Sequence, residues 1–278
     1  MFGEKIRSAC CKVSGSLLNI MADTKVYIFE NSFSLTNYFI KKWCAIGHAS
    51  IVRQGRFSVA LCGGQTPVEF YCKLSNLDEP ALWSKTHIFL TDERFVSLDH
   101  PDSNYKMVRE LLLDYTGIPE SNIHPVHTYC DSPVVAAQQY EKELRRFFQL
   151  KDGELPRFDL LLLGVGKDGH TASLFPGTMA ELEEDRLAVE VKHHLIHYER
   201  VTLTLPVLNN ARKIFIMGKG PSKAKIFDHI LNGPSRFPAA RVSPTDGDIV
   251  FLLDKDAATN VKLGPAYYHD DEAVVVQL

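Results

Sequence analysis

Residues 158–177 read FDLLLLGVGKDGHTASLFPG, a strand-like segment that leads into a glycine-rich loop. The segment Phe158–Leu163 is largely apolar, as in a strand that is covered on both faces of a parallel sheet. Gly164–Gly169 matches GxGxxG, the dinucleotide-binding fingerprint. That fingerprint needs a helix running on from its last glycine, and Pro176 and Gly177 would cut such a helix short. We therefore favour a tight glycine turn over a nicotinamide site.

The turn would place Asp168 and His170 at a pocket. Histidine titrates near neutral pH and can serve as a general base. A lone histidine is more often structural. A histidine two residues beyond an aspartate, in a glycine-rich loop, favours a functional role.

Strand-like and helix-like segments alternate on both sides of this stretch. The expected strands are Lys25–Phe29, Phe57–Leu61, His87–Leu90, Ile123–Val126, Phe158–Leu163, Val201–Leu205, Lys213–Met217 and Ile249–Leu253. The expected helices are about Ser34–Arg53, Val68–Leu77, Tyr105–Asp114, Val134–Leu150 and Ser222–Leu231. This alternation predicts an α/β fold with a mostly parallel sheet and helices on both faces, in a single domain of residues 21–278.

Ligands of open parallel sheets bind beyond the carboxyl ends of the strands. Four unusual segments are expected there: Cys62–Pro67, Thr91–Tyr105, Gly164–Gly177 and Gly218–Lys223. They are far apart in the sequence but would share one edge of the sheet, which predicts a single ligand site.

The segment Gly63-Gly64-Gln65-Thr66-Pro67 lies between an expected strand and an expected helix. Its two glycines let the backbone approach a ligand closely, and Thr66 is a candidate cap for the helix. Free N–H groups at a helix start bind phosphate. The alternative is an ordinary strand-to-helix turn.

Other charged side chains follow one expected strand, open another and lie at an expected helix start. Asp92, Glu93 and Arg94 come directly after an apolar strand. Arg200 and Lys223 are further cations, suited to a phosphate as a planar fork and as a point charge. Each alone is more often a solvated surface charge. Together with the glycine loop they predict a local positive site, which the net charge of -3 does not supply.

Composition excludes several other classes. The net charge argues against a nucleic-acid binder, and no apolar run approaches the roughly 18 residues of a membrane span. The six cysteines form no CxxC pair, as in a reduced intracellular protein. No GxSxG or HExxH motif is present, and the histidines His193, His194 and His197 indicate a solvated loop rather than a metal site. Residues 1–20 are expected to be a loosely docked or disordered extension, with a transit peptide as the alternative.

The loop Gly164–Gly177 resembles the signature of the 6-phosphogluconolactonases, GxGxDGHTASLFPG. Four further segments fit the same family in order: Gly63–Pro67, Asp92–Arg94 with Ser103–Tyr105, Arg200–Thr204 and Pro238–Val242. The resemblance covers about residues 24–255 and implies a Rossmann-like fold. One departure is Gln65, where a serine is common in the family.

Two related groups share this fold. Glucosamine-6-phosphate deaminases and isomerases have a glutamate where this chain has Phe175, and they lack an arginine at the position of Arg94. Sugar-phosphate-sensing regulators carry a helix-turn-helix ahead of the fold, for which the roughly 20 residues before the first strand leave too little chain. The resemblance therefore favours the lactonase, with the deaminase as the alternative.

The resemblance implies hydrolysis of 6-phospho-D-glucono-1,5-lactone in the pentose phosphate pathway, without a cofactor or metal. His170 would activate water, Asp168 or Asp92 would orient the imidazole, and Arg94 would stabilise the oxyanion. The phosphate would bind Gly63, Gly64, Thr66, Arg200 and Lys223. We expect a cytoplasmic monomer that contacts neither nucleic acid nor membrane, with organellar targeting by residues 1–20 as the alternative.

Overall fold

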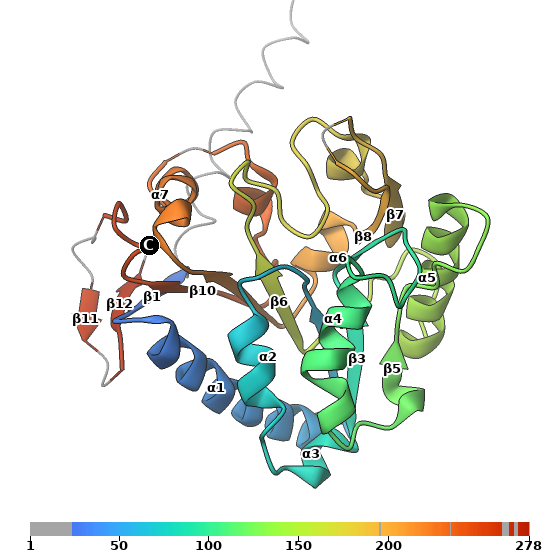
Figure 1. Ribbon diagram of the computed structural model, residues 1–278, viewed down its shortest axis with the longest axis horizontal. Coiled ribbons are helices and arrows are strands. Elements are labelled where there is room, and N and C mark those ends of the chain that lie inside the picture. The colour runs from blue at the N-terminus through green and yellow to red at the C-terminus, as the bar shows by residue number, and fades with distance from the viewer. Residues whose placement is uncertain (1–23, 195, 234, 263–266, 270–271, 278) are drawn as a thin grey trace, which may run out of the picture.

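Most of the apolar strands predicted from the sequence lie side by side in the centre of the molecule (Figure 1). The computed structural model describes residues 24–194, 196–233, 235–262, 267–269 and 272–277. The expectations for residues 1–20, and the domain start at residue 21, lie outside these described residues.

Within the described residues the main sheet has nine strands. In spatial order they are β11 (Tyr267–His269), β12 (Val274–Gln277), β1 (Lys25–Phe29), β10 (Asp248–Asp254), β9 (Lys213–Gly218), β6 (Leu160–Gly164), β2 (Phe57–Leu61), β3 (Thr86–Leu90) and β5 (Ile123–His124). The neighbouring strands from β1 through β10, β9, β6, β2 and β3 to β5 all pair in parallel. β12 pairs antiparallel with β1, and β11 pairs antiparallel with β12. The predicted mostly parallel sheet is confirmed.

Alternate side chains of the strands face two separate hydrophobic clusters. In β6, Leu160 and Leu162 belong to one cluster, and Leu161 and Leu163 belong to the other. This alternation follows from the two-residue period of a strand, and it requires apolar side chains on both faces. It explains the largely apolar run Phe158–Leu163.

Helices cover both faces, as predicted (Figure 1). One face packs against α1 (Ser32–Gln54), α2 (Val68–Leu74), α3 (Pro80–Trp83) and α4 (Asn104–Leu111). The other packs against α5 (Pro133–Phe148), α6 (Leu205–Asn209) and α7 (Ala224–Leu231). Short 3-10 helices are η1 (Leu113–Tyr115), η2 (Glu120–Asn122), η3 (Met179–Leu182), η4 (Pro221–Lys223) and η5 (Pro238–Arg241).

A second, antiparallel sheet of three strands has the order β4 (Asp92–Arg94), β8 (Arg200–Leu203) and β7 (Ala188–Val191). The expectation that Val201–Leu205 and the parallel strands form one sheet is wrong. β8 instead pairs with Asp92–Arg94, which was expected to be a loop. The backbone hydrogen bonds of this segment depend on a partner more than 100 residues away, so no local pattern reveals them.

The chain order reverses between β2 and β6, which are parallel neighbours. The connection after β2 leads to β3 on one side, and the connection after β6 leads to β9 on the other. A crevice beyond the carboxyl ends of the strands is expected at such a switch point. The loops that begin at Cys62 and Val165 leave the sheet at this point.

Candidate active site

A pocket of about 280 Å³ lies at the switch point. It is lined by Cys62, Gly63, Gly64, Gln65, Thr66, Asp92, Arg94, Asn104, Gly164, Val165, Gly166, His170, Ala172, Arg200 and Lys223. Among the candidate site residues, only Asp168 does not line it directly, and Asp168 contacts His170. The four predicted loops therefore meet at one edge.

The loop after β6 holds an aspartate–histidine pair. Nδ1 of His170 lies 2.5 Å from Oδ1 of Asp168, and the imidazole side chain is 30% exposed. The turn is closed by two backbone bonds, from Gly166 N to the His170 carbonyl and from Gly169 N to the Gly166 carbonyl. Because the carboxylate binds Nδ1, a neutral imidazole presents its Nε2 lone pair away from Asp168.

The two glycines of this turn have little room for a side chain. A Cβ at Gly166 would lie 2.2 Å from His170 Nδ1 and 2.4 Å from Asp168 Oδ1. Gly169 has φ +82°, and a Cβ there would lie 2.3 Å from a ring carbon of Phe237. The glycines therefore allow the histidine to fold back onto the aspartate.

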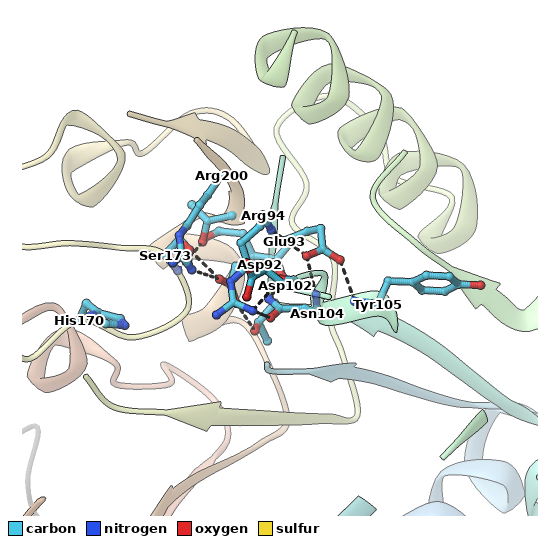
Figure 2. A network of polar contacts seen from close by, with 12 residues as sticks. Asp92, Glu93, Arg94, Asp102, Asn104, Tyr105, His170, Ser173 and Arg200 are labelled. Atoms are coloured by element: carbon cyan, nitrogen blue, oxygen red, sulfur yellow. Dashed lines mark hydrogen bonds and ion pairs between the residues drawn. The ribbon is translucent and has the colours of Figure 1, made fainter. Parts of the chain in front are cut away.

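Asp92 interacts with a different set of groups. Its Oδ2 accepts a 2.6 Å hydrogen bond from Ser173 Oγ and lies 3.6 Å from Nη1 of Arg200 (Figure 2). Of the two aspartates considered for orienting His170, the structure thus brings only Asp168 into contact with the imidazole. Asp92 compensates the charge of Arg200 instead.

Arg200 is a cation with few protein partners. Its side chain is 17% exposed, and burial lowers its pKa even though Asp92 acts in the opposite direction. Its Nε is buried without a hydrogen-bond partner in the described part of the chain. Its guanidinium carbon lies 5.6 Å from the ring centre of Phe175, and the ring centre of His170 lies 4.4 Å from that of Phe175. Arg200 and His170 therefore both lie near the Phe175 ring and line the same pocket, and Arg200 has donor capacity for an anion.

Arg94 lines the same pocket as His170 and lies beside Asn104, apart from the histidine (Figure 2). Its Nη1 donates to the Asp102 carbonyl at 2.9 Å and to Asn104 Oδ1 at 2.7 Å. Both bonds use one terminal nitrogen. Since a guanidinium carries five N–H donors, donors remain for a ligand in the pocket.

Lys223 also lines the pocket and is bound to the loop after β6. Its Nζ donates to the Val165 carbonyl at 2.5 Å. Burial lowers the pKa of this amine, and the neighbouring Lys167 acts in the same direction. An anion in the pocket would offset both effects.

The glycine loop after β2 differs from the prediction in one respect. Helix α2 begins at Val68 after Pro67, without a side-chain cap, so the prediction that Thr66 caps it is wrong. The turn places Pro67 itself in a helical conformation at the N-cap position. A Cβ at Gly63 would lie 1.8 Å from Asn104 Oδ1, which shows how closely the two loops approach.

Sequence reasoning did not assign site roles to Asn104 and Ser173. Asn104 donates from Nδ2 to the Asp92 carbonyl at 2.8 Å, and Ser173 holds the Asp92 carboxylate. Ser103 is the N-cap of α4. The only sequence signal for Asn104 was its place in the Ser103–Tyr105 segment.

The histidines of the 193–197 segment do not form a recognisable metal centre. His193 lies parallel to Phe175, with ring centres 6.1 Å apart, and His197 lies against Tyr198. No three His, Cys, Asp or Glu side chains group as metal ligands among the residues whose positions are described. No helix in that part of the chain is long and apolar enough to cross a membrane.

Comparison with known proteins shows to which family the chain belongs. The model for glucosamine-6-phosphate isomerases/6-phosphogluconolactonase matches residues 30–251. A 6-phosphogluconolactonase of Synechocystis sp. is 43% identical over 216 residues, which cover 77% of this chain and 88% of that protein.

Solved structures agree with this match. A Trypanosoma brucei 6-phosphogluconolactonase is similar with a TM-score of 0.77 and 33% identity, covering 85% of this chain and 98% of that one. One from Thermotoga maritima has a TM-score of 0.73 and 30% identity, covering 84% and 100%.

Proposed function

The chain belongs to the glucosamine-6-phosphate isomerase/6-phosphogluconolactonase family, and from this premise we propose that it hydrolyses 6-phospho-D-glucono-1,5-lactone to 6-phosphogluconate. The observation that carries the proposal is the Asp168–His170 pair, which shares one pocket with three cations, Arg94, Arg200 and Lys223. A sugar phosphate lactone needs a base for water at its ester carbon and cations for its phosphate and oxyanion. The pocket contains both.

His170 acts as the general base. Asp168 accepts a hydrogen bond from Nδ1–H, so Nε2 is free to remove a proton from water as the water oxygen attacks C1 of the lactone. The carbonyl electrons move to oxygen, and the oxyanion is held by Arg94. When this intermediate collapses, the bond from C1 to the ring oxygen breaks, and the imidazolium returns its proton to that oxygen. The products are a carboxylic acid, which ionises, and the free hydroxyl of the opened sugar.

The phosphate binds at the remaining cations. Lys223 and Arg200 supply charge, and the backbone of Gly63 and Gly64, with the Thr66 hydroxyl, supplies neutral donors on the adjoining wall. The reaction requires no metal in this scheme, because the lactone is an activated ester and general-base help contributes roughly 10²–10⁴-fold. One chain supplies every group named here, so the scheme requires no second subunit.

A coupled assay tests the proposal. Glucose 6-phosphate is oxidised enzymatically to the lactone, and the disappearance of the lactone is followed with and without the protein. We expect disappearance well above the spontaneous rate, unchanged by EDTA. A rate equal to the spontaneous one would refute the proposal, and a loss with EDTA that zinc restores would refute metal independence.

The alternative, a glucosamine-6-phosphate deaminase, is tested in parallel by ammonia release from glucosamine 6-phosphate. Phe175 disfavours it, because its apolar ring is 6% exposed and contacts the His170 ring in a place where ring opening and isomerisation need a further proton-transfer group. Ammonia release without lactone hydrolysis would select this alternative.

A further inference from the structure

Glu93 is a fully buried carboxylate between two pocket residues, Asp92 and Arg94. Successive side chains of a strand point to opposite sides, and in β4 this turns Glu93 away from the pocket, toward the start of α4 (Figure 2). The mechanism above gives it no role. A buried charge costs free energy unless it is well bonded, so its partners are informative.

Four donors converge on this carboxylate. Oε1 accepts the backbone N–H groups of Arg94 and Asn104, each at 2.7 Å, and Oε2 accepts the N–H of Tyr105 at 2.7 Å and the Ser103 hydroxyl at 3.1 Å. The N–H groups of Asn104 and Tyr105 belong to the first turn of α4, where backbone donors have no partner within the helix. Glu93 therefore joins the start of α4 to β4.

The residue fixed most directly by this junction is Asn104. Its backbone is bound by Glu93, its Nδ2 donates to the Asp92 carbonyl, and its Oδ1 accepts from Arg94 Nη1 at 2.7 Å. The same Oδ1 lies against Gly63, where a Cβ would be only 1.8 Å away. Asn104 thus sets the direction of the Arg94 guanidinium and the spacing of the glycine loop.

The pKa of Glu93 reflects both its burial and its bonds to the start of α4. Burial, with Asp92 acting in the same direction, raises the pKa of Glu93 to about 7, and the three backbone N–H bonds oppose this rise. A helix could be capped by Ser103 alone, as it caps α4 through Lys106 N. The additional carboxylate bonds the Arg94 backbone as well as the helix.

We propose that Glu93 is a positioning residue for the reaction: through Asn104 it holds the Arg94 guanidinium at the place in the pocket where the substrate's developing negative charge forms. The chemical role of Arg94 rests on the proposed function. The geometric claim, that Glu93 acts through Arg94, does not.

A double-mutant cycle of Glu93→Gln and Arg94→Ala tests this claim. Glutamine keeps the shape but replaces one acceptor oxygen with an NH2 group that opposes the converging N–H donors. We expect E93Q to reproduce the kinetic pattern of R94A, with kcat reduced at least tenfold and KM changed less than threefold. In the R94A background, E93Q should change kcat by less than twofold, because the residue through which it acts is gone.

The matched control is Thr86→Val, which removes one buried hydrogen bond, from Thr86 Oγ1 to the Leu82 carbonyl, at the far end of β3. It should lower the melting temperature without changing kcat or KM. A loss of kcat for E93Q that multiplies fully with that of R94A, or a loss of stability alone, as in Thr86→Val, would overturn the proposal.

Two other results would still test the proposal: an E93Q variant that does not fold, and an R94A variant that changes KM alone. If E93Q does not fold, the cycle of Asn104→Ala with Arg94→Ala replaces it, and multiplicative effects there would equally overturn the proposal. If R94A raises KM and leaves kcat unchanged, the oxyanion role of Arg94 fails. E93Q must then raise KM likewise for the positioning role to stand.

Discussion

At the scale of single residues, Asp168 and Asp92 carry the same group but serve different partners. Asp168 lies 2.5 Å from the imidazole of His170, whereas Asp92 binds Ser173 and faces Arg200. The first arrangement fixes a tautomer, and the second compensates a buried cation. Sequence position alone made the two aspartates equivalent candidates.

His170→Ala should reduce kcat by roughly 10²–10⁴-fold, the contribution of a positioned general base. Affinity for the product 6-phosphogluconate should change little, because the cations that we propose to bind phosphate remain. Steady-state kinetics and calorimetry measure the two effects. Asp168→Asn should cause a smaller loss of kcat, since the amide can still accept from Nδ1 but does not stabilise the imidazolium. Wild-type turnover in His170→Ala would exclude the base role.

Lys223→Ala should act mainly on binding. Loss of one charge-assisted bond to phosphate corresponds to about 1.5–3 kcal/mol, or roughly a 10- to 100-fold increase in KM. The matched control is Lys219→Ala, since that lysine pairs with Glu69 at 3.2 Å and does not line the pocket. It should leave KM unchanged. Equal KM values for both variants would contradict a phosphate role for Lys223.

At the scale of elements, the loop after β6 is shaped by its glycines rather than by a regular structure. Gly166 and Gly169 leave space for the folded-back histidine and for Phe237. Ala172 in the same loop has φ +47°, a region that costs a residue with a Cβ about 1–2 kcal/mol. The loop is therefore constrained by its contacts, and its conformation determines the position of the Asp168–His170 pair.

Gly166→Ala should displace the imidazole, because the new methyl group would overlap both His170 Nδ1 and Asp168 Oδ1. A shift of about 1 Å in a catalytic group costs on the order of 10²-fold in rate. We expect a loss of kcat of this size in the lactone assay. Gly117→Ala is the control, since a Cβ there would have no neighbour within 4 Å. Full activity of Gly166→Ala would show that the observed turn is not required.

At the scale of the whole molecule, the parallel sheet ends at β5, where two histidines meet. His87 Nδ1 lies 3.2 Å from His124 Nε2, and His124 Nδ1 lies 2.7 Å from Glu143 of α5. Burial, with help from His124 and Arg56, lowers the pKa of His87 to about 4. This edge of the fold therefore favours a neutral imidazole.

The sign of the pH dependence follows from that shift. The unfolded chain binds a proton at His87 near pH 6.5, whereas the folded chain binds it near pH 4. Stability from this group is present above pH 6.5 and is lost as the pH falls toward 4. Urea unfolding at pH 7.5 and 5.0 should show a smaller decrease in unfolding free energy for His87→Phe than for the wild type. An equal decrease in both would rule out His87 as a source of the acid sensitivity.

Local sequence patterns predicted the order and type of most of the main elements. Phe57–Leu61 and Lys25–Phe29 were predicted with the observed bounds, and the loop Gly164–Gly177 indicated the site and its histidine. Such features are encoded locally, in apolar periodicity and in glycines that permit particular backbone angles.

Which charged side chains pair with one another depends on contacts between distant segments, so the sequence alone could not predict it. The antiparallel partner of Asp92–Arg94, the burial of Glu93 and the choice of Asp168 as the partner of His170 depend on which segments the fold brings together. A carboxylate next to a strand has the same local sequence whether it faces solvent, a cation or a helix start. Its environment, and with it its pKa and role, is set by contacts with residues distant in the chain.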